Sequence, residues 1–235
     1  MTSIAHAPVT TDLPNRPEGF LPTTRVRAGG AALVTGGALC VTGGTLHPIV
    51  DGRSHSVDAL TAPLSPLAQV LLAVGTVLLI LGLPTLHGWL DGRIGRLGSI
   101  GLLAYLLGNL VTAGAHLVVE VFVAQPLAAD PATAGLISDD DSMLGTTAFD
   151  AVNGVGGVVM LAGIAAFGVG LLRSGAVPRW IGALTTVGML GFFLPIPATQ
   201  FLSGFVYEAP RGIAITALGV LMLRSRRRSV SLSGQ

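Results

Sequence analysis

Long apolar stretches, separated by short polar segments, dominate the pattern of this chain. Six stretches rich in Leu, Val, Ala and Gly lie near residues 28–47, 66–87, 97–120, 151–172, 180–200 and 204–223. An α-helix rises about 1.5 Å per residue, so about 20 apolar residues cross the roughly 30 Å hydrocarbon core of a bilayer. The pattern therefore predicts an all-α fold, a polytopic transmembrane bundle of six helices.

Prolines and charged residues interrupt some of these stretches. Pro84 predicts a kink in the second helix, and Pro195 and Pro197 predict one in the fifth, because proline removes a backbone donor. In the sixth stretch, Glu208, Pro210 and Arg211 interrupt the first half. A helix that began only at Arg211 would be too short to cross a bilayer, so the start of this span decides the topology.

Both ends of the chain differ from the apolar region between them. Residues 1–24 contain four prolines and no apolar periodicity, which predicts a disordered tail and not a signal peptide. Residues 25–224 form the expected transmembrane domain. Residues 225–235 form a short basic tail, which we interpret as an orientation signal.

The arginines predict the orientation of the bundle. With six crossings, eleven of the 13 basic residues lie in segments on one side, and Arg53 and Arg211 alone lie on the other. Cytoplasmic segments of membrane proteins carry an excess of Arg and Lys. We therefore expect both termini in the cytoplasm.

Composition supports a membrane protein and excludes several other classes. Hydrophobic residues make up 51% of the chain and charged residues 11%, well below the roughly 25% typical of soluble domains. A net charge of +1 argues against a nucleic-acid partner. All 13 basic residues are arginine, which is typical of a GC-rich bacterial genome. We therefore expect a multi-pass protein of a bacterial inner membrane.

Small residues recur in two of the predicted helices. In the first, five of them are spaced by four residues: Ala28, Ala32, Gly36, Cys40 and Gly44. In the fourth, Gly154, Gly157 and Gly163 suggest a similar helix face made of small residues. Small residues let the backbones of neighbouring membrane helices approach closely. We therefore place these two helices at the centre of the bundle.

The third predicted helix has the clearest functional pattern. Tyr105, Asn109, Thr112, His116 and Glu120 follow one another at intervals of three or four residues. This spacing keeps all five within about 80° of one helix face. Ionisable groups inside a membrane are costly and commonly functional, so the face is expected to point into the bundle.

Other polar residues fall near the same predicted depth as His116 and Glu120, at the outer edge of the membrane. They are His47, Asp150, Asn153, Gln200, Glu208 and Arg211. Structural alternatives apply to several of them. His47 is equally well explained as the end of a helix, Asp150 as an N-cap, and Glu208 with Arg211 as a solvated loop pair.

This layer predicts acid–base chemistry on an apolar substrate. We expect His116, Glu120 and Asp150 to be catalytic, and Tyr105, Asn109, Thr112, His47, Asn153, Gln200, Glu208 and Arg211 to bind the substrate. A histidine one turn from a carboxylate can transfer protons. The expected substrate is a lipid or isoprenoid, and epoxide opening or cyclisation are suitable reactions.

Several alternatives remain open at this point. A metal would recruit His47, His116, Glu120 and Asp150, and a haem would be bridged by His47 and His116. No compact ligand motif is present, so we expect neither a metal nor a cofactor. A transporter of small solutes or protons, and a passive bundle that binds a membrane partner, are the non-catalytic alternatives. The expected partners are the lipid bilayer and an apolar small molecule, and the sequence defines no oligomeric state.

The first half of the chain also resembles known proteins. The resemblance rests on three segments: Leu46-His47-Pro48, Leu83-Pro84-Thr85-Leu86-His87 and Arg93-Ile-Gly-Arg96-Leu-Gly. Over residues 28–125 they resemble small six-span integral membrane proteins of bacteria whose function is unknown. The resemblance implies the architecture and no catalytic residues.

Overall fold

The computed structural model describes residues 21–90 and 92–225, and every element within them is a helix. The longer helices are α1 (Thr23–Leu46), α3 (Ser65–Leu90), α4 (Gly95–Val111), α6 (Thr147–Ser174), α7 (Arg179–Gly188) and α8 (Leu202–Arg224). The shorter ones are α2 (Val57–Leu60), α5 (Gln125–Ala129), the π-helices η1 (Thr112–Leu117) and η2 (Glu120–Ala124), and the 3₁₀-helices η3 (Ala134–Leu136) and η4 (Met189–Phe193). The tails expected at 1–24 and 225–235 lie almost wholly outside the described residues.

The prediction of an all-α membrane bundle is confirmed. Within the described residues, five helical segments are long and apolar enough to cross a membrane: α1, α3, residues Gly95–Ala129, α6 and α8. The last of these resolves the question of the sixth stretch, because α8 begins at Leu202 and continues through Pro210 without a break. The count of six spans stays a prediction.

The structure differs from the prediction over residues 180–200. α7 ends at Gly188, and after the 3₁₀ turn of η4 the backbone becomes extended at Leu194 (ψ 137°). Pro195 explains this, because the residue before a proline is disfavoured in the α conformation. The α-helix therefore ends before these prolines, where the sequence predicted a kink within it.

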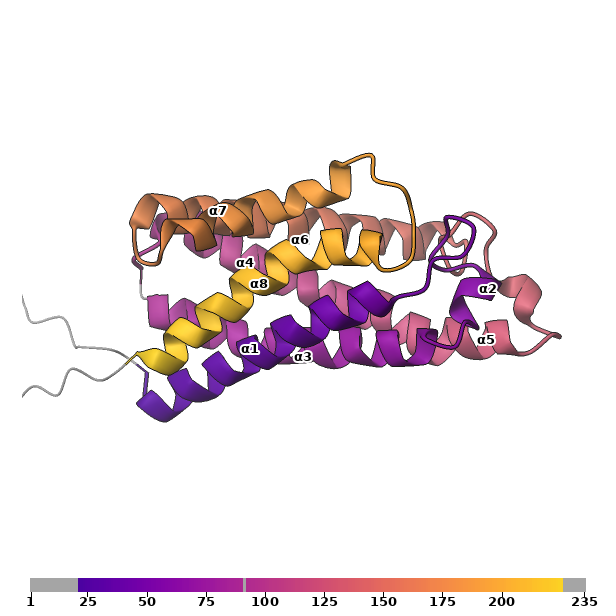
Figure 1. The fold of residues 1–235 in the computed structure, drawn as a ribbon, viewed down its shortest axis with the longest axis horizontal. Coiled ribbons are helices and arrows are strands. Elements are labelled where there is room, and N and C mark those ends of the chain that lie inside the picture. The colour runs from indigo at the N-terminus through magenta and orange to yellow at the C-terminus, as the bar shows by residue number, and fades with distance from the viewer. Residues whose placement is uncertain (1–20, 91, 226–235) are drawn as a thin grey trace, which may run out of the picture.

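The six longer helices pack in a closed ring. α1 packs between α3 and α8, and α6 packs between α4 and α7. The two groups of three meet where α3 contacts α4 and where α7 contacts α8 (Figure 1). Since each helix has two main neighbours, the inner faces meet in one apolar core, which contains Leu33, Leu83 and Phe167.

The ring has two different ends. The first residues of α1 and the last residues of α8 lie at the same end of the bundle, while α2 and α5 lie at the other (Figure 1). This arrangement agrees with an even number of passages along the bundle. We call the end that contains α2 and α5 the loop end.

Glycines allow the closest helix contacts. A Cβ on Gly36 of α1 would lie 2.9 Å from the carbonyl oxygen of Gly75 in α3, closer than real contacts of this kind. Near the loop end, Gly204 of α8 similarly packs against the backbone of Gly44 in α1. The small-residue face of α1 is therefore confirmed at Gly36, Cys40 and Gly44, which are buried, whereas Ala28 is exposed.

On α6 only one of the three predicted glycines, Gly163, is packed against another helix. Gly154 and Gly157 face open space, whereas Gly156, Gly163 and Gly170 contact α4. These three glycines are spaced by seven residues, about two helical turns, which is the spacing of contacts along one line between two packed helices. The prediction failed at Gly154 and Gly157 because several glycines of this stretch have compatible spacings and the sequence does not say which face meets a neighbour.

Candidate functional site

A buried glutamate lies at the centre of the site. Glu120 is the first residue of η2, in the helical segment that continues from α4, and its side chain is fully buried. The expected polar face points inward, since Tyr105 and Asn109 are also buried. The helix is not α-helical throughout, however, because η1 and η2 are π-helical. An angular estimate based on 100° per residue therefore fails beyond Val111.

His47 and Gln69 hold one oxygen of this carboxylate. His47, which directly follows the last residue of α1, places its Nε2 2.8 Å from Glu120 Oε1. Gln69 of α3 donates from Nε2 to the same oxygen at 2.7 Å, and also to Ser65 Oγ at 2.9 Å. Three distant segments of the chain thus meet at Glu120, while the predicted role of His47 in substrate binding stays a prediction.

A second histidine, His55, approaches from the loop between α1 and α2. Its Nε2 lies 3.8 Å from Glu120 Oε1. The carboxylate of Asp141 accepts the backbone N–H of His55 at 2.5 Å, and the carbonyl oxygen of Asp141 lies 3.1 Å from His55 Nδ1. Asp141 has a φ of 70°, in the left-handed region, which Asp adopts more readily than most residues. The loop that contains Asp141 therefore positions His55.

His116 completes the group. Its Nε2 lies 3.6 Å from the second carboxylate oxygen, Glu120 Oε2, as expected for residues four apart on one face. The imidazole ring of His55 stacks edge-on between the other two, with ring centroids 5.7 Å from His47 and 5.1 Å from His116. We call His47, His55, His116 and Glu120 the histidine cluster.

The electrostatics of the cluster favour positive charge on His47. Burial of its ring disfavours the charged form, but the hydrogen bond and negative charge of Glu120 outweigh burial and raise the pKa of His47 above its usual value. Without another cation in the cluster, a proton on His47 therefore compensates the buried carboxylate.

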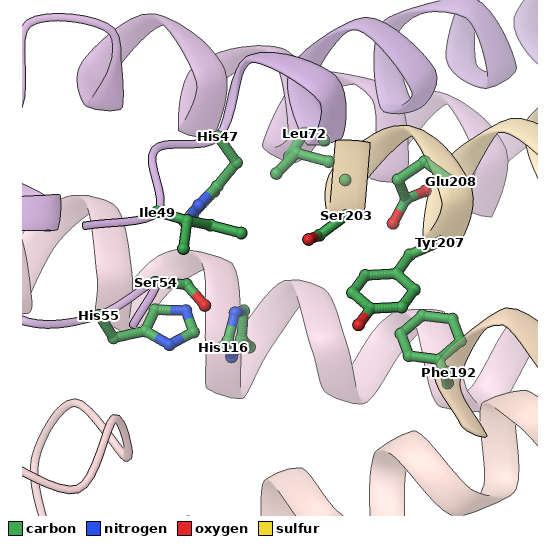
Figure 2. A pocket seen from close by; sticks show the side chains of 12 residues that line it. His47, Ile49, Ser54, His55, Leu72, His116, Phe192, Ser203, Tyr207 and Glu208 are labelled. Carbon is green, nitrogen blue, oxygen red and sulfur yellow. The ribbon is translucent and has the colours of Figure 1, made fainter. Parts of the chain in front are cut away.

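A cavity of about 180 Å³ lies beside the cluster. All three histidines line one side of it, while Ser203, Tyr207 and Phe192 line the other (Figure 2). Its remaining walls are mainly apolar and include Ile49, Leu72, Gly44 and Gly204. An apolar cavity of about 150 Å³ is large enough to bind benzene, so this cavity can hold the head of a small molecule.

The predicted pair of Glu208 and Arg211 is largely buried, and Glu208 lies at the far wall of the cavity. Arg211 Nε donates to Glu208 Oε2 at 2.7 Å, and its Nη2 contacts the other carboxylate oxygen. Glu208 lines the cavity, and the guanidinium also lies 6.0 Å from the ring centre of Phe192. The interpretation of this pair as a solvated loop pair is therefore wrong, because α8 begins before it.

The remaining residues of the polar face have structural contacts. Asn109 donates to the carbonyl oxygen of Tyr105 at 2.7 Å, and Thr112 Oγ1 lies 3.9 Å from Met160 Sδ. The hydroxyl of Tyr105 is buried and has no hydrogen-bond partner. None of the three lines the cavity beside the cluster.

Three predicted site residues lie away from the cluster. Asp150 is exposed in the first turn of α6, whose N-cap is Thr146, so the N-cap interpretation is wrong as well. Its carboxylate still lies where the helix dipole favours negative charge. Asn153 is half-buried on α6, and Gln200 is exposed in the segment before α8. We assign none of them to the site.

Sequence reasoning missed His55, Gln69 and Asp141. His55 and Asp141 lie in loops, where no periodicity indicates which way a side chain points. Gln69 did leave a signal, since an amide within an otherwise apolar helix needs a buried polar partner. Tyr207 and Ser203 were missed because the start of α8 was unsettled.

Comparisons with known proteins assign no function to the chain, so a function has to be inferred from the geometry of the site. No family model, curated protein or solved structure matches the chain.

Proposed function

We propose that this membrane protein is an enzyme that performs acid–base chemistry on an amphipathic molecule, with the histidine cluster as its catalytic group. One observation supports this most: three imidazoles surround a fully buried carboxylate and line the same cavity. Buried ionisable groups in a membrane protein are costly, so their concentration beside a cavity favours a function.

The cavity suits the head of the substrate better than the whole molecule. Its volume of about 180 Å³ is smaller than the roughly 300–1,000 Å³ of pockets that enclose a drug-sized ligand. Ile49, Leu72 and Phe192 provide apolar contact, and Ser203 and Tyr207 provide hydroxyl groups on the wall opposite the histidines. We infer a lipid or isoprenoid substrate whose polar or reactive end enters the cavity while its chain stays in the membrane.

His116 is the best candidate for proton transfer to this head. Its side chain is 30% exposed, the most of the three histidines, and it lines the cavity. Glu120 lies one turn away, with its Oε2 3.6 Å from His116 Nε2. Opening of an epoxide or a proton-initiated cyclisation fits a general acid in such an apolar site.

Blocking the cavity tests the proposal. The purified protein and an Ile49→Trp variant are incubated with extracted bacterial lipids, and the bound and converted molecules are identified by mass spectrometry. We expect the unmodified protein to retain and convert an amphipathic molecule, and Ile49→Trp to do neither. Leu81→Trp is the matched control, because Leu81 is 63% exposed on the outer face of α3.

His116→Ala separates catalysis from binding. We expect this variant to retain the molecule without converting it. Retention by Ile49→Trp at the level of Leu81→Trp, or conversion by His116→Ala at the normal rate, would contradict the proposal.

A transporter is a second candidate, favoured by the early end of α7. Interrupted helices often form substrate sites in transporters, and η4 places Phe192 in the wall of the cavity. Uptake of a retained molecule into proteoliposomes, without chemical change, would favour transport over catalysis.

For the location, we propose a bacterial inner membrane with the loop end outside the cytoplasm. Arg93 and Arg96 join α3 to α4 at the end opposite the histidine cluster, and Arg173 and Arg179 join α6 to α7 there. A thiol reagent that does not cross membranes should label Ser54→Cys in intact cells and spare Ser174→Cys. The reverse labelling would contradict this orientation.

A further inference from the structure

The hydrogen bonds at the Nδ1 atoms fix the orientation of two imidazoles. His47 Nδ1 lies 3.2 Å from the carbonyl oxygen of Pro48, and His55 Nδ1 lies 3.1 Å from the carbonyl oxygen of Asp141. A carbonyl oxygen only accepts hydrogen bonds, so each Nδ1 must be the protonated nitrogen. In the neutral ring, each Nε2 then presents a lone pair.

Both of these lone pairs point at a carboxylate. His47 Nε2 and His55 Nε2 lie 2.8 and 3.8 Å from Glu120 Oε1. The other oxygen, Glu120 Oε2, is buried and has no hydrogen-bond partner. Two cations can satisfy a carboxylate that faces imidazole lone pairs: a proton on His47, as described above, or a metal ion bound between these groups, and only a metal ion engages His55 as well.

We propose that His47, His55 and Glu120 bind a divalent transition-metal ion such as zinc. Their three ligand atoms lie within 4.8 Å of one another. Tetrahedral bonds of about 2.0–2.1 Å place ligand atoms roughly 3.3 Å apart, between the two distances to Glu120 Oε1. Small side-chain rotations therefore suffice for coordination. Two imidazoles and one carboxylate also form an established ligand set for catalytic zinc and for iron(II).

The surroundings match those of a metal site. Metal-binding histidines commonly donate their second N–H to a carbonyl or carboxylate, as His47 and His55 do here. Gln69 in turn donates to the Glu120 carboxylate and restricts its orientation. Because His47 and His55 also line the cavity, a position on the metal faces the expected substrate. This inference rests on the proposed function for the role of the metal, but metal binding itself is measured without a substrate.

Zinc binding by the full chain in detergent tests the inference. The purification tag is removed, the protein is treated with a chelator, and zinc affinity and stoichiometry are measured by competition with a zinc-sensitive dye. We expect about one zinc ion per chain, and a loss of affinity of more than about 100-fold for His55→Ala, which removes a direct ligand. Because His55 lies in a loop, this variant is expected to fold, and its circular dichroism spectrum checks this.

His87→Ala is the matched control. His87 lies in the last turn of α3, at the opposite end of the bundle, so this variant should bind zinc like the unmodified protein. Cobalt(II) provides a second measurement, since its visible absorption reports on nitrogen and oxygen ligands. Absence of zinc binding in the unmodified protein, or equal binding by His55→Ala and His87→Ala, would overturn the metal site. The cavity experiment above would then still decide the proposed enzyme separately.

Discussion

Two buried carboxylates near the loop end are partnered in different ways. Glu208 forms a two-pronged ion pair with Arg211, one turn further along the same helix. Glu120 has no arginine or lysine among its partners in the described residues, and instead faces three histidines and Gln69. Both lie beside the same cavity, although Glu120 is behind the histidines that line it.

The difference indicates different roles. Arginine remains charged at all physiological pH values, so the charge of Glu208 is permanently compensated. Histidines exchange protons near neutral pH and bind metals, so the compensation of Glu120 can change. The first arrangement is suited to holding α8 in place, and the second to chemistry. The following variants separate the two.

Removal of Arg211 should have the largest effect. Arg211→Leu leaves the buried Glu208 carboxylate without its partner, which typically costs about 3–5 kcal/mol of unfolding free energy. The double variant Glu208→Gln with Arg211→Leu should recover most of this loss, because no charge is then stranded. Unfolding in detergent, followed by circular dichroism, measures both. A double variant as unstable as the single one would mean that Arg211 stabilises the bundle through packing.

Glu120→Gln should cost less. The amide keeps the shape of the side chain and an oxygen for Gln69, but it loses the charged hydrogen bond to His47, worth about 1.5–3 kcal/mol. A double-mutant cycle with His47→Ala should show that the two losses are not additive. Zinc binding and turnover should be lost as well. Full activity in Glu120→Gln would contradict the assignment of a chemical role to Glu120.

Gly44→Ala should act on Glu208 and leave Glu120 unaffected. A methyl group at Gly44 would overlap the Glu208 side chain, and overpacking of this kind costs about 1–3 kcal/mol. Zinc binding by the folded variant should be unchanged. Gly114→Ala is the control, since a Cβ there meets nothing within 4 Å. A stability loss in the control equal to that of Gly44→Ala would point to a general effect of the added methyl groups.

Asp141→Ala should have the smallest effect on stability and a clear effect on the site. Asp141 lies in a loop with its side chain partly exposed, but alanine adopts the left-handed φ of 70° less readily than aspartate, so the free energy of unfolding should fall by about 1 kcal/mol. Loss of its carboxylate frees the backbone of His55, and supporting residues of this kind alter metal affinity by about 10–100-fold. Unchanged zinc affinity would show that the loop holds His55 without Asp141.

The fold was predictable from the sequence where apolar length alone decides it. The helices around residues 28–47, 66–87 and 151–172 needed no tertiary information, because a bilayer requires about 20 apolar residues for a spanning helix. Composition did not predict the end of α7, since residues 189–200 are as apolar as a helix in this chain. Two prolines, each of which restricts the residue before it, determine the local conformation there.

The candidate site was predictable where side chains share one helix. His116 and Glu120 were found because they are four residues apart, and Glu208 and Arg211 because they are three apart. His55 was not, since its position depends on Asp141, 86 residues later in the chain. Residues that two loops bring together have no regular spacing in the sequence by which they could be recognised.

The π-helical turns at η1 and η2 have a consequence for chain length. In η1 the N–H of Val118 bonds to the carbonyl of Ala113, five residues back, so the turn accommodates one residue more than an α-turn. A protein with the same architecture and an ordinary α-helix would reach the same place with one residue fewer. Its glutamate would then occupy an earlier position in an alignment. Insertions and deletions, and not only substitutions, therefore need to be considered when the ancestry of this helix is traced.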